Sequence, residues 1–224
     1  MSDEDSGTGW EGAYASNDEV GWDTGDPQPV VKALVASDAI ANPVLDVGCG
    51  LGTESCFLAS EGYDVLGVDV APTAVERALA RATERGLDDR VEFAVGDALE
   101  FGTTGGVVDA NEAATVLDVG VFHALGGPDS DHDDGRSAYA DALARVLEPG
   151  GRAFVLSFAP GAPEDWPPDL ISRRDVRDAF DADGTDGDGS DGDWRVVEFR
   201  DETFVSRGGE VPALLSVLER KRGP

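Results

Sequence analysis

Short apolar runs alternate along the chain with segments in which apolar residues recur every three or four positions. Continuous apolar runs of this kind are typical of buried parallel strands, and we expect strands over 44–47, 64–70, 91–95, 114–119 and 152–158. The segments between them have the helical period, with helices expected over 53–61, 72–86 and 137–147. This alternation predicts an α/β fold with a doubly wound, mostly parallel, Rossmann-like sheet.

The pattern changes in the last quarter of the chain. Ser172 and Asp175 have the spacing of a capping box, which predicts the start of a short helix. Two strands, expected over 194–199 and 213–219, follow with no helical pattern between them, so we expect an antiparallel closing pair. Residues 181–193 hold six Asp and four Gly, and no start in this run gives the register of an EF-hand calcium loop. We therefore expect a flexible acidic insertion there.

The N-terminal segment has a different character. Residues 1–9 are polar and acidic, and we expect a disordered tail. Residues 10–26 have no regular pattern but carry three aromatic residues, Trp10, Tyr14 and Trp22. Pro29 is suited to the first turn of a helix, which we expect to run through residue 39.

The chain is strongly acidic. It has 224 residues, enough for one domain with a full core, and its 46 acidic and 17 basic residues give a formal net charge of -29. Such a charge repels phosphates, so we expect no nucleic-acid partner. Acidic surface aids solubility in concentrated salt, where self-repulsion is screened, and we therefore expect a halophilic protein.

The sequence shows no sign of a metal site, a disulfide framework, a signal peptide or a membrane-spanning segment. Cys49 and Cys56 have neither the number nor the spacing of a disulfide framework or a metal site, so we expect no metal. The chain shows no signal peptide and no apolar run near 18 residues, so we expect a cytoplasmic protein with no membrane partner. A monomer is the default expectation.

The most informative motif follows the first expected strand, where Asp46 precedes glycines at every second position, Gly48, Gly50 and Gly52. A glycine turn at a helix N-terminus lets the backbone approach a ligand closely. Dinucleotide-binding loops place their third glycine three residues after the second, where this chain has Thr53. The spacing therefore disfavours a NAD-dependent oxidoreductase.

Polar side chains are expected at the carboxyl ends of the next strands, where doubly wound sheets bind ligands. Asp69 lies 23 residues after Asp46 and suits hydrogen bonds to ribose hydroxyls, while Asp97 suits an adenine amino group. Asp118 and His123 follow on or after the fourth strand. Asp69 alternatively caps a helix, and Asp97 alternatively closes a turn. Asp118 alternatively serves as a structural hydrogen-bond acceptor, and His123 as a buried histidine.

Taken in order, these motifs resemble those of class I S-adenosylmethionine (SAM) dependent methyltransferases. The resemblance rests on the turn at 46–52, Asp69, Gly96-Asp97 and the Glu-Pro-Gly-Gly turn at 148–151. It implies a seven-stranded sheet with an antiparallel last strand, SAM as the cofactor, and a methyltransferase domain over 43–222. The cofactor-binding residues that it implies are Trp22, Asp46, Gly48, Cys49, Gly50, Gly52, Asp69, Val70, Asp97, Ala98 and Asp118.

A narrower resemblance lies in residues 21–29, Gly-Trp-Asp-Thr-Gly-Asp-Pro-Gln-Pro, and in residues 117–123. Both are similar to a subgroup that includes thiopurine S-methyltransferases, plant halide/thiol methyltransferases and tellurite-resistance methyltransferases. The subgroup's N-terminal segment folds over the cofactor, which implies a lid segment and helix over 10–42, with Trp22 near the sulfonium. An aromatic face attracts a sulfonium cation, and closure excludes water. Alternatively, Trp22 only fastens the N-terminal segment to the core.

We therefore expect a SAM-dependent methyltransferase (EC 2.1.1.-) with a small-molecule acceptor, a soft nucleophile such as a thiol, halide, selenium or tellurium species. Methyl transfer is an in-line displacement in which the protein mainly supplies alignment and a desolvated pocket. His123 is the candidate base for a thiol proton, with Asp118 as the second candidate catalytic residue. Methylation of nitrogen, oxygen or carbon, and a non-catalytic SAM-binding role, stay open because acceptor specificity lies in loops.

Overall fold

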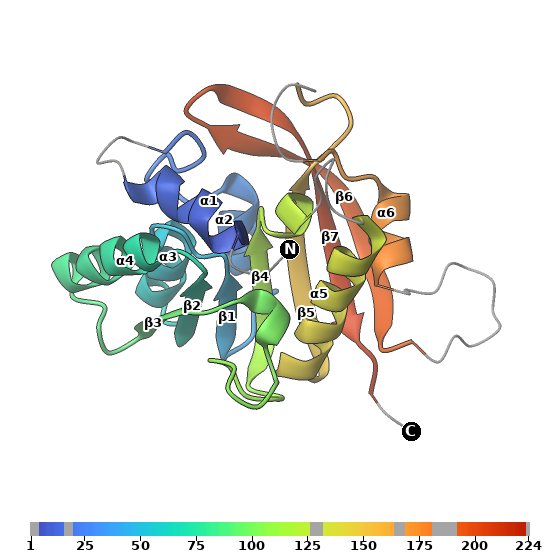
Figure 1. Cartoon of the computed structure of the whole chain (residues 1–224), viewed down its shortest axis with the longest axis horizontal. Coiled ribbons are helices and arrows are strands. Elements are labelled where there is room, and N and C mark those ends of the chain that lie inside the picture. Colours follow the sequence, from blue (N-terminus) through green and yellow to red (C-terminus); the bar gives the residue numbers. More distant parts are fainter. Residues whose placement is uncertain (1–4, 16–19, 126–131, 164–168, 181–191, 223–224) are drawn as a thin grey trace.

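The computed structural model describes residues 5–15, 20–125, 132–163, 169–180 and 192–222 (Figure 1). The acidic insertion expected over 181–193 lies outside these residues except for its last two positions. Within the described ranges, no helix combines the length and the apolarity needed to cross a membrane.

A seven-stranded sheet forms the centre of the fold, in the order β3-β2-β1-β4-β5-β7-β6 (Figure 1). Its strands are β1 (Val44–Val47), β2 (Val65–Asp69), β3 (Val91–Val95), β4 (Ala113–Val119), β5 (Leu147–Phe158), β6 (Trp194–Ser206) and β7 (Gly209–Arg220). Strands β1 to β5 pair in parallel, whereas β7 is antiparallel to both β5 and β6. The predicted Rossmann-like sheet with an antiparallel last strand is confirmed.

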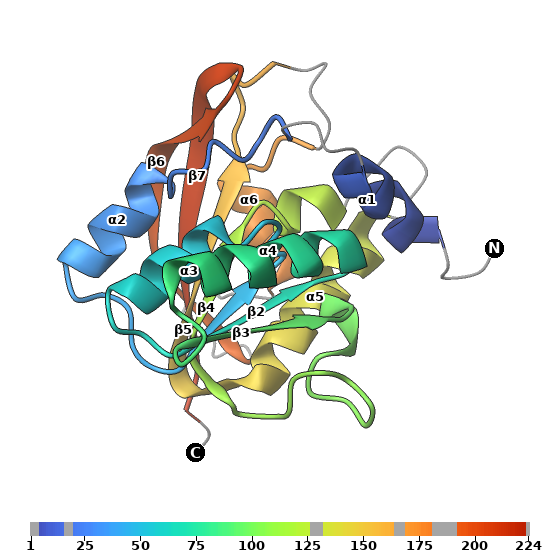
Figure 2. The same cartoon turned by 90° about the vertical axis from the view of Figure 1, so that its left-hand side faces the viewer.

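Helices cover both faces of the sheet. The helices α5 (His132–Val146) and α6 (Arg173–Ala179) pack on one face, and α2 (Pro29–Ala36), α3 (Thr53–Ser60) and α4 (Pro72–Arg85) pack on the other. Figure 2 shows the strands between α4 in front and α5 behind. Each face buries its own apolar core, one around Tyr139 and Leu143, the other around Leu34 and Cys56. Burial on both faces explains why the parallel strands are continuous apolar runs rather than alternating ones.

The N-terminal region is more ordered than its composition suggests. Helix α1 (Asp5–Ala15) extends from the expected tail into the segment expected to be irregular, so residues 10–15 are helical and that prediction is wrong for them. Glu11 accepts a hydrogen bond from Thr73 N at 3.1 Å, at the start of α4, whose own N-cap residue is Ala71. Tyr14 is buried. These contacts are tertiary, and composition does not reveal them.

Two predicted boundaries at the other end of the sheet are also corrected. Ala113 pairs with Leu147 whereas Thr115 pairs with Arg152, so residues 148–151 form an irregularity within β5 instead of a turn before it. The last two strands are longer than predicted, because residues 203–212 continue the β6–β7 hairpin beyond the end of β5. This end of the hairpin extends past the sheet at the top of Figure 1.

Local sequence signals set the ends of two helices as predicted. Helix α4 ends at Gly86, which has a φ of 65°. Helix α6 begins with a capping box: Ser172 Oγ accepts from Asp175 N at 3.3 Å, and Asp175 Oδ2 accepts from Ser172 N at 2.7 Å.

Candidate functional site

The glycine turn connects the carboxyl end of β1 to the start of α3. Gly48, Gly50 and Gly52 have positive φ values of 65°, 52° and 72°. The N–H groups of Gly48 and Cys49 both donate to Val68 O, at 2.7 and 3.1 Å, which fastens the turn to the neighbouring strand β2. A left-handed backbone at three alternate positions is the physical reason for the repeated glycines.

The turn also leaves little room for side chains. A Cβ atom at Gly48 would lie 2.1 Å from Val121 Cγ2, after β4, and one at Gly52 would lie 2.9 Å from Ala78 Cβ, on α4. A Cβ atom at Gly50 would lie 3.0 Å from the hydroxyl oxygen of Tyr14, on α1. Side chains from α1, from α4 and from the residues after β4 therefore approach the backbone of the turn closely.

Asp69, the last residue of β2, lies beside the turn. Its Oδ2 accepts from Gly50 N and its Oδ1 from Ala71 N, both at 2.9 Å. The bond to Ala71, the N-cap residue of α4, is the helix-capping role expected as the alternative for Asp69. The bond to Gly50 places the carboxylate beside the glycine turn. Burial raises the pKa of Asp69, against the opposing effect of its backbone hydrogen bonds. Each carboxylate oxygen has more than one lone pair, so Asp69 can accept further hydrogen bonds.

Asp46 lies beneath the turn. It is 2% exposed and accepts a hydrogen bond from Ser55 Oγ of α3. Burial, together with the nearby Glu54 carboxylate, raises the pKa of Asp46 to about 8. These contacts make Asp46 a support for the junction of β1 and α3.

Asp97 follows β3, the strand next to β2. Its Oδ1 accepts from Leu99 N at 2.9 Å and begins the short helix η1 (Ala98–Glu100), which is the turn role weighed above. The side chain is exposed, and within the described residues no hydrogen bond engages its Oδ2. Val70 and Ala98, the expected apolar neighbours of the site, are both half-buried directly after Asp69 and Asp97.

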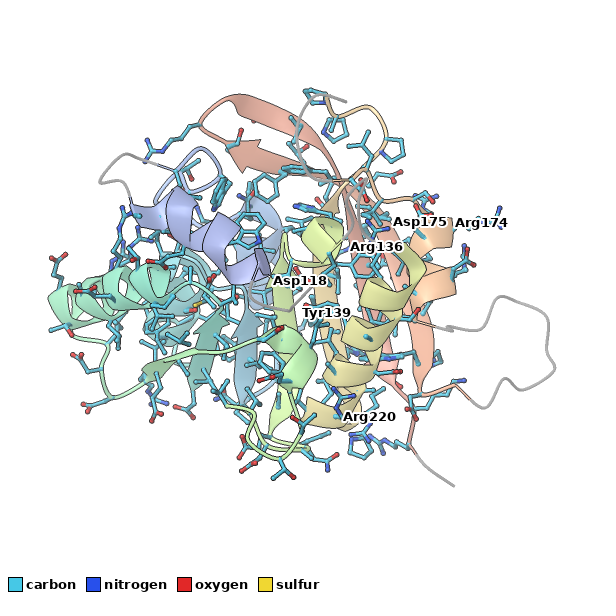
Figure 3. The ribbon with its side chains drawn as sticks, viewed as in Figure 1. Asp118, Arg136, Tyr139, Arg174, Asp175 and Arg220 are labelled. Atoms are coloured by element: carbon cyan, nitrogen blue, oxygen red, sulfur yellow. The ribbon has the colours of Figure 1, made fainter. Side chains whose placement is uncertain are left out.

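Asp118 is fully buried near the carboxyl end of β4. Its Oδ1 accepts from Val121 N at 2.7 Å, and its Oδ2 accepts from Phe122 N at 3.0 Å and from the Tyr139 hydroxyl at 2.8 Å. Figure 3 shows Asp118 and Tyr139 on the facing elements β4 and α5. Burial raises the pKa of Asp118 to about 6, although these three donors oppose the shift. The carboxylate therefore holds the helix η2 (Phe122–Leu125) and α5 together.

His123 lies in η2 and is also buried, at 5% exposed. Its Nδ1 accepts from Phe158 N at 2.9 Å, and its ring stacks on the Phe158 ring with centroids 4.4 Å apart. Burial, with the charge of Arg136, lowers the pKa of His123 to about 3. We infer a neutral ring whose proton is on Nε2, and a Cβ atom at Gly120 would lie 3.4 Å from that nitrogen. Because the Nδ1 lone pair already accepts the hydrogen bond from Phe158 N, His123 is poorly placed to act as a base.

Three aromatic residues gather over the turn. The Trp22 ring makes edge-to-face contacts with Trp10 and Tyr14, with centroids 5.7 and 5.8 Å apart, and its Nε1 donates to the Tyr14 hydroxyl at 3.3 Å. Burial and the Asp69 carboxylate raise the pKa of Tyr14. Sequence analysis chose Trp22 and missed Tyr14, the member of the trio next to Gly50. Trp10 and Tyr14 lie four residues apart, which puts both side chains on one face of a helix. This spacing is the signal in the sequence that indicates a shared contact surface for the two rings.

Residues 44–151 match a family model described as a methyltransferase domain. Over these residues the chain is similar to a methyltransferase domain. The matched residues include the glycine turn and the polar side chains at the ends of β2, β3 and β4. The aromatic trio lies outside them, on the N-terminal segment that precedes the methyltransferase domain.

The names of the chain's relatives refer to different acceptors. The chain is 33% identical over 149 residues to a 2-heptyl-1-hydroxyquinolin-4(1H)-one methyltransferase of Mycobacteroides abscessus, covering 66% of this chain but only 59% of that relative. It is 28% identical to probable thiol methyltransferase 2 of Arabidopsis thaliana, over 77% of this chain and 70% of the relative. A structure solved for the conversion of a disulfide bond into a thioacetal group during echinomycin biosynthesis superposes with a TM-score of 0.80 and 28% identity, covering 97% of this chain and 94% of that one.

Proposed function

We propose that the protein is an enzyme that transfers the methyl group of SAM to the sulfur of a small-molecule thiol. The proposal rests on the hydrogen bonds that already engage the two candidate catalytic side chains, His123 and Asp118. His123 Nδ1 is bonded to Phe158 N, and the carboxylate of Asp118 accepts three hydrogen bonds. Neither group is placed to remove a proton, and a thiol, with a pKa of about 8.5, ionises without strong base catalysis. Halide, selenium and tellurium acceptors likewise react without strong base catalysis.

The residues around the turn suit the parts of SAM. When bound, SAM supplies a methyl group on a positively charged sulfur, which an in-line nucleophile can displace. We assign the ribose hydroxyls to Asp69 and the adenine amino group to Oδ2 of Asp97, because carboxylates accept hydrogen bonds from both. Val70 and Ala98 then flank the adenosine, and the backbone of Gly48, Cys49, Gly50 and Gly52 lies against the remainder. Asp46 and Asp118 support these groups from within the sheet.

The aromatic trio closes this site in our proposal. Trp22 packs near the sulfonium, where an aromatic face stabilises positive charge, and the Tyr14 hydroxyl positions the Trp22 indole. Closure also excludes water from the reacting sulfur atoms. Replacing Trp22 by Ala is expected to weaken SAM binding, whereas unchanged affinity would support the alternative that Trp22 only fastens the N-terminal segment.

His123 has a different role here from the one expected from the sequence. Its Nε2–H, beside Gly120 at the carboxyl end of β4, is suited to donate a hydrogen bond to an anionic acceptor. A thiolate then arrives already ionised, and His123 holds it in line with the methyl group. Residues that provide alignment in a desolvated pocket are sufficient for so reactive a nucleophile.

Two of the relatives support sulfur as the accepting atom, since one is described as a thiol methyltransferase and another was solved for thioacetal formation. The second candidate is oxygen. It is supported by a relative described as a tocopherol O-methyltransferase of Arabidopsis thaliana, which is 30% identical over 116 residues. The acceptor named for the Mycobacteroides abscessus relative also carries a hydroxyl group. A hydroxyl group with a high pKa requires more help from a base than a thiol does.

The test is a methylation screen in concentrated potassium chloride, read out as S-adenosylhomocysteine. Matched pairs of thiols and alcohols with the same carbon skeleton, together with iodide, selenite, tellurite and a hydroxyquinolinone, compare the acceptor atoms directly. We expect turnover of thiols above that of their alcohol partners. Turnover confined to the oxygen acceptors would contradict the proposal, and tight SAM binding with no turnover across the panel would favour a non-catalytic role. Calorimetry with SAM and NAD checks the cofactor.

A further inference from the structure

The loop that carries Trp22 is bound by the far end of the β6–β7 hairpin. We call residues 20–28 the lid loop. At its end, Gln28 Nε2 donates to Val205 O at 2.9 Å and Gln28 Oε1 accepts from Val205 N at 2.8 Å. The side-chain amide of Gln28 therefore pairs with the hairpin as a neighbouring strand would. Figure 2 shows the lid loop, in blue before α2, running beside β6 and β7.

Arg207, in the turn of this hairpin, holds both neighbours of Trp22. Its backbone N–H donates to Gly21 O at 2.9 Å, and its side-chain Nε donates to Asp23 O at 2.8 Å. Two bonds from one residue to the carbonyls on either side of Trp22 fix the backbone from which the indole projects. Both acceptors are neutral carbonyls, so bulk salt screens these bonds less than it screens an exposed ion pair.

Asp23 fastens the same point of the lid loop to the methyltransferase domain. Its Oδ1 accepts from Thr53 Oγ1 at 3.0 Å, and its Oδ2 accepts from Arg81 Nη2 at 3.3 Å. Thr53 is the first residue of α3, directly after the glycine turn. The lid loop is thus held on one side by the hairpin and on the other side by the helix that follows the turn.

The indole itself connects this arrangement to the candidate site. Trp22 Nε1 donates to the Tyr14 hydroxyl at 3.3 Å, and that hydroxyl lies against Gly50. The Trp22 side chain is nonetheless 38% exposed, so burial in the core does not fix its orientation. The backbone on either side and the Tyr14 hydroxyl therefore decide where the ring lies.

We propose that Arg207 is a positioning residue for the cofactor: through Gly21 and Asp23 it places the Trp22 ring over the sulfonium of SAM. The inference rests on the proposed function, because it takes the site beneath the aromatic trio to be the SAM site. Arg207 lies 184 residues from Asp23 in the sequence, and it acts through Trp22 rather than by touching the cofactor.

The test measures binding of SAM and of S-adenosylhomocysteine by calorimetry, without any acceptor. Both ligands have the same adenosine, but only SAM has a positive sulfur for the ring to stabilise. We expect Arg207→Ala to weaken SAM binding about three- to tenfold and S-adenosylhomocysteine binding much less. In a Trp22→Ala background, Arg207→Ala is expected to have no further effect, because the side chain that it positions is gone.

Arg173→Ala is the matched control, since Arg173 is an exposed arginine that donates to Asp201 at 2.7 Å, and we expect this variant to leave SAM binding unchanged. If Arg207→Ala did not fold, Arg207→Lys would replace it, because lysine keeps the charge but lacks the Nε–H. Equal loss of both ligands, an equal loss in the Trp22→Ala background, or no loss would overturn the inference. A wild-type protein that binds neither ligand would instead overturn the proposed function, and the inference with it.

Discussion

The backbone N–H of Phe158 donates a 2.9 Å hydrogen bond to Nδ1 of His123. This bond joins the carboxyl end of β5 to the helix that follows β4, and the stacked rings of the two residues bury it. A protonated imidazole has no lone pair to accept such a bond. The contact therefore keeps His123 neutral, in agreement with the lowering of its pKa to about 3 by burial and by the charge of Arg136.

The first prediction concerns the pH dependence of thiol methylation. If the thiolate arrives already ionised, the inflection of kcat/KM with pH belongs to the thiol and not to His123. We expect the inflection to move by about one pH unit between two thiols whose pKa values differ by one unit. Initial rates of S-adenosylhomocysteine formation between pH 6 and pH 10 measure it.

Variants of His123 separate its two nitrogens. His123→Asn keeps an acceptor near Phe158 N but removes the Nε2–H, and we expect kcat to fall about 10- to 100-fold, the loss typical of a hydrogen bond to a charged group. The inflection should stay where the thiol places it. An inflection that is the same for every thiol and disappears in His123→Asn would instead identify His123 as a base.

The second prediction tests why the turn requires glycine. Gly48→Ala imposes a positive φ on a side chain, at a cost of about 1 kcal/mol, and brings Cβ to 2.1 Å from Val121 Cγ2, an overlap that costs about 1–3 kcal/mol more. We expect a correspondingly lower free energy of unfolding in urea and weaker SAM binding. Gly62→Ala is the matched control, because Gly62 has a φ of 98° and open space around its Cα.

The double variant Gly48→Ala/Val121→Ala distinguishes strain from overlap. It removes Val121 Cγ2 and leaves the positive φ, so we expect it to recover most of the overlap cost and none of the strain. If the double variant were no more stable than Gly48→Ala, the crowding around the turn would not be what excludes a side chain.

The sequence predicts most reliably those features that depend on residues close together along the chain. The glycine turn, Asp69 at the end of β2, Gly86 at the end of α4 and the capping box at Ser172 all depend on residues within a few positions of one another. Local patterns therefore sufficed to predict the strands and the glycine turn, whereas the seven-stranded sheet was implied by the family resemblance. The alternation of apolar runs and helical stripes reports the same local periodicities.

The features that the sequence left undecided depend on distant partners. His123 bonds to a residue 35 positions away, and the Tyr139 hydroxyl reaches Asp118 across 21 positions. Helix α1 gains its contact from Glu11 to Thr73, 62 positions apart. No local pattern encodes such pairs, so an accessible base and a buried, bonded histidine look the same in the sequence.

The third prediction follows from the raised pKa of Asp46. In the unfolded chain Asp46 ionises near pH 4, whereas burial keeps it protonated in the folded state up to about pH 8. Between these values the unfolded state binds fewer protons, so its ionisation reduces stability as pH rises. Asp46→Asn retains an acceptor for Ser55 Oγ and does not titrate. Relative to wild type, we expect this variant to gain at most about 1.4 kcal/mol per pH unit from pH 4 to pH 8.

Urea unfolding at several pH values measures this difference. Asp141→Asn, which removes one negative charge from the exposed face of α5, is the matched control for the change in net charge. A constant difference between Asp46→Asn and wild type across the pH range would mean that Asp46 is ionised in the folded protein. The contact with Ser55 would then hold a buried carboxylate rather than a carboxylic acid.

The fourth prediction concerns salt. With a formal net charge of -29, the folded chain repels itself, and this repulsion is screened when the Debye length falls from about 10 Å at 0.1 M salt to about 3 Å at 1 M. We expect the Tm to rise with potassium chloride across this range. Glu76, Glu84 and Asp89 are exposed on or just after α4, and replacing them with Gln, Gln and Asn removes three negative charges. The triple variant should melt higher than wild type at 0.1 M salt and depend less steeply on it. A wild-type protein most stable at low salt would show that its acidic surface is not an adaptation to concentrated salt.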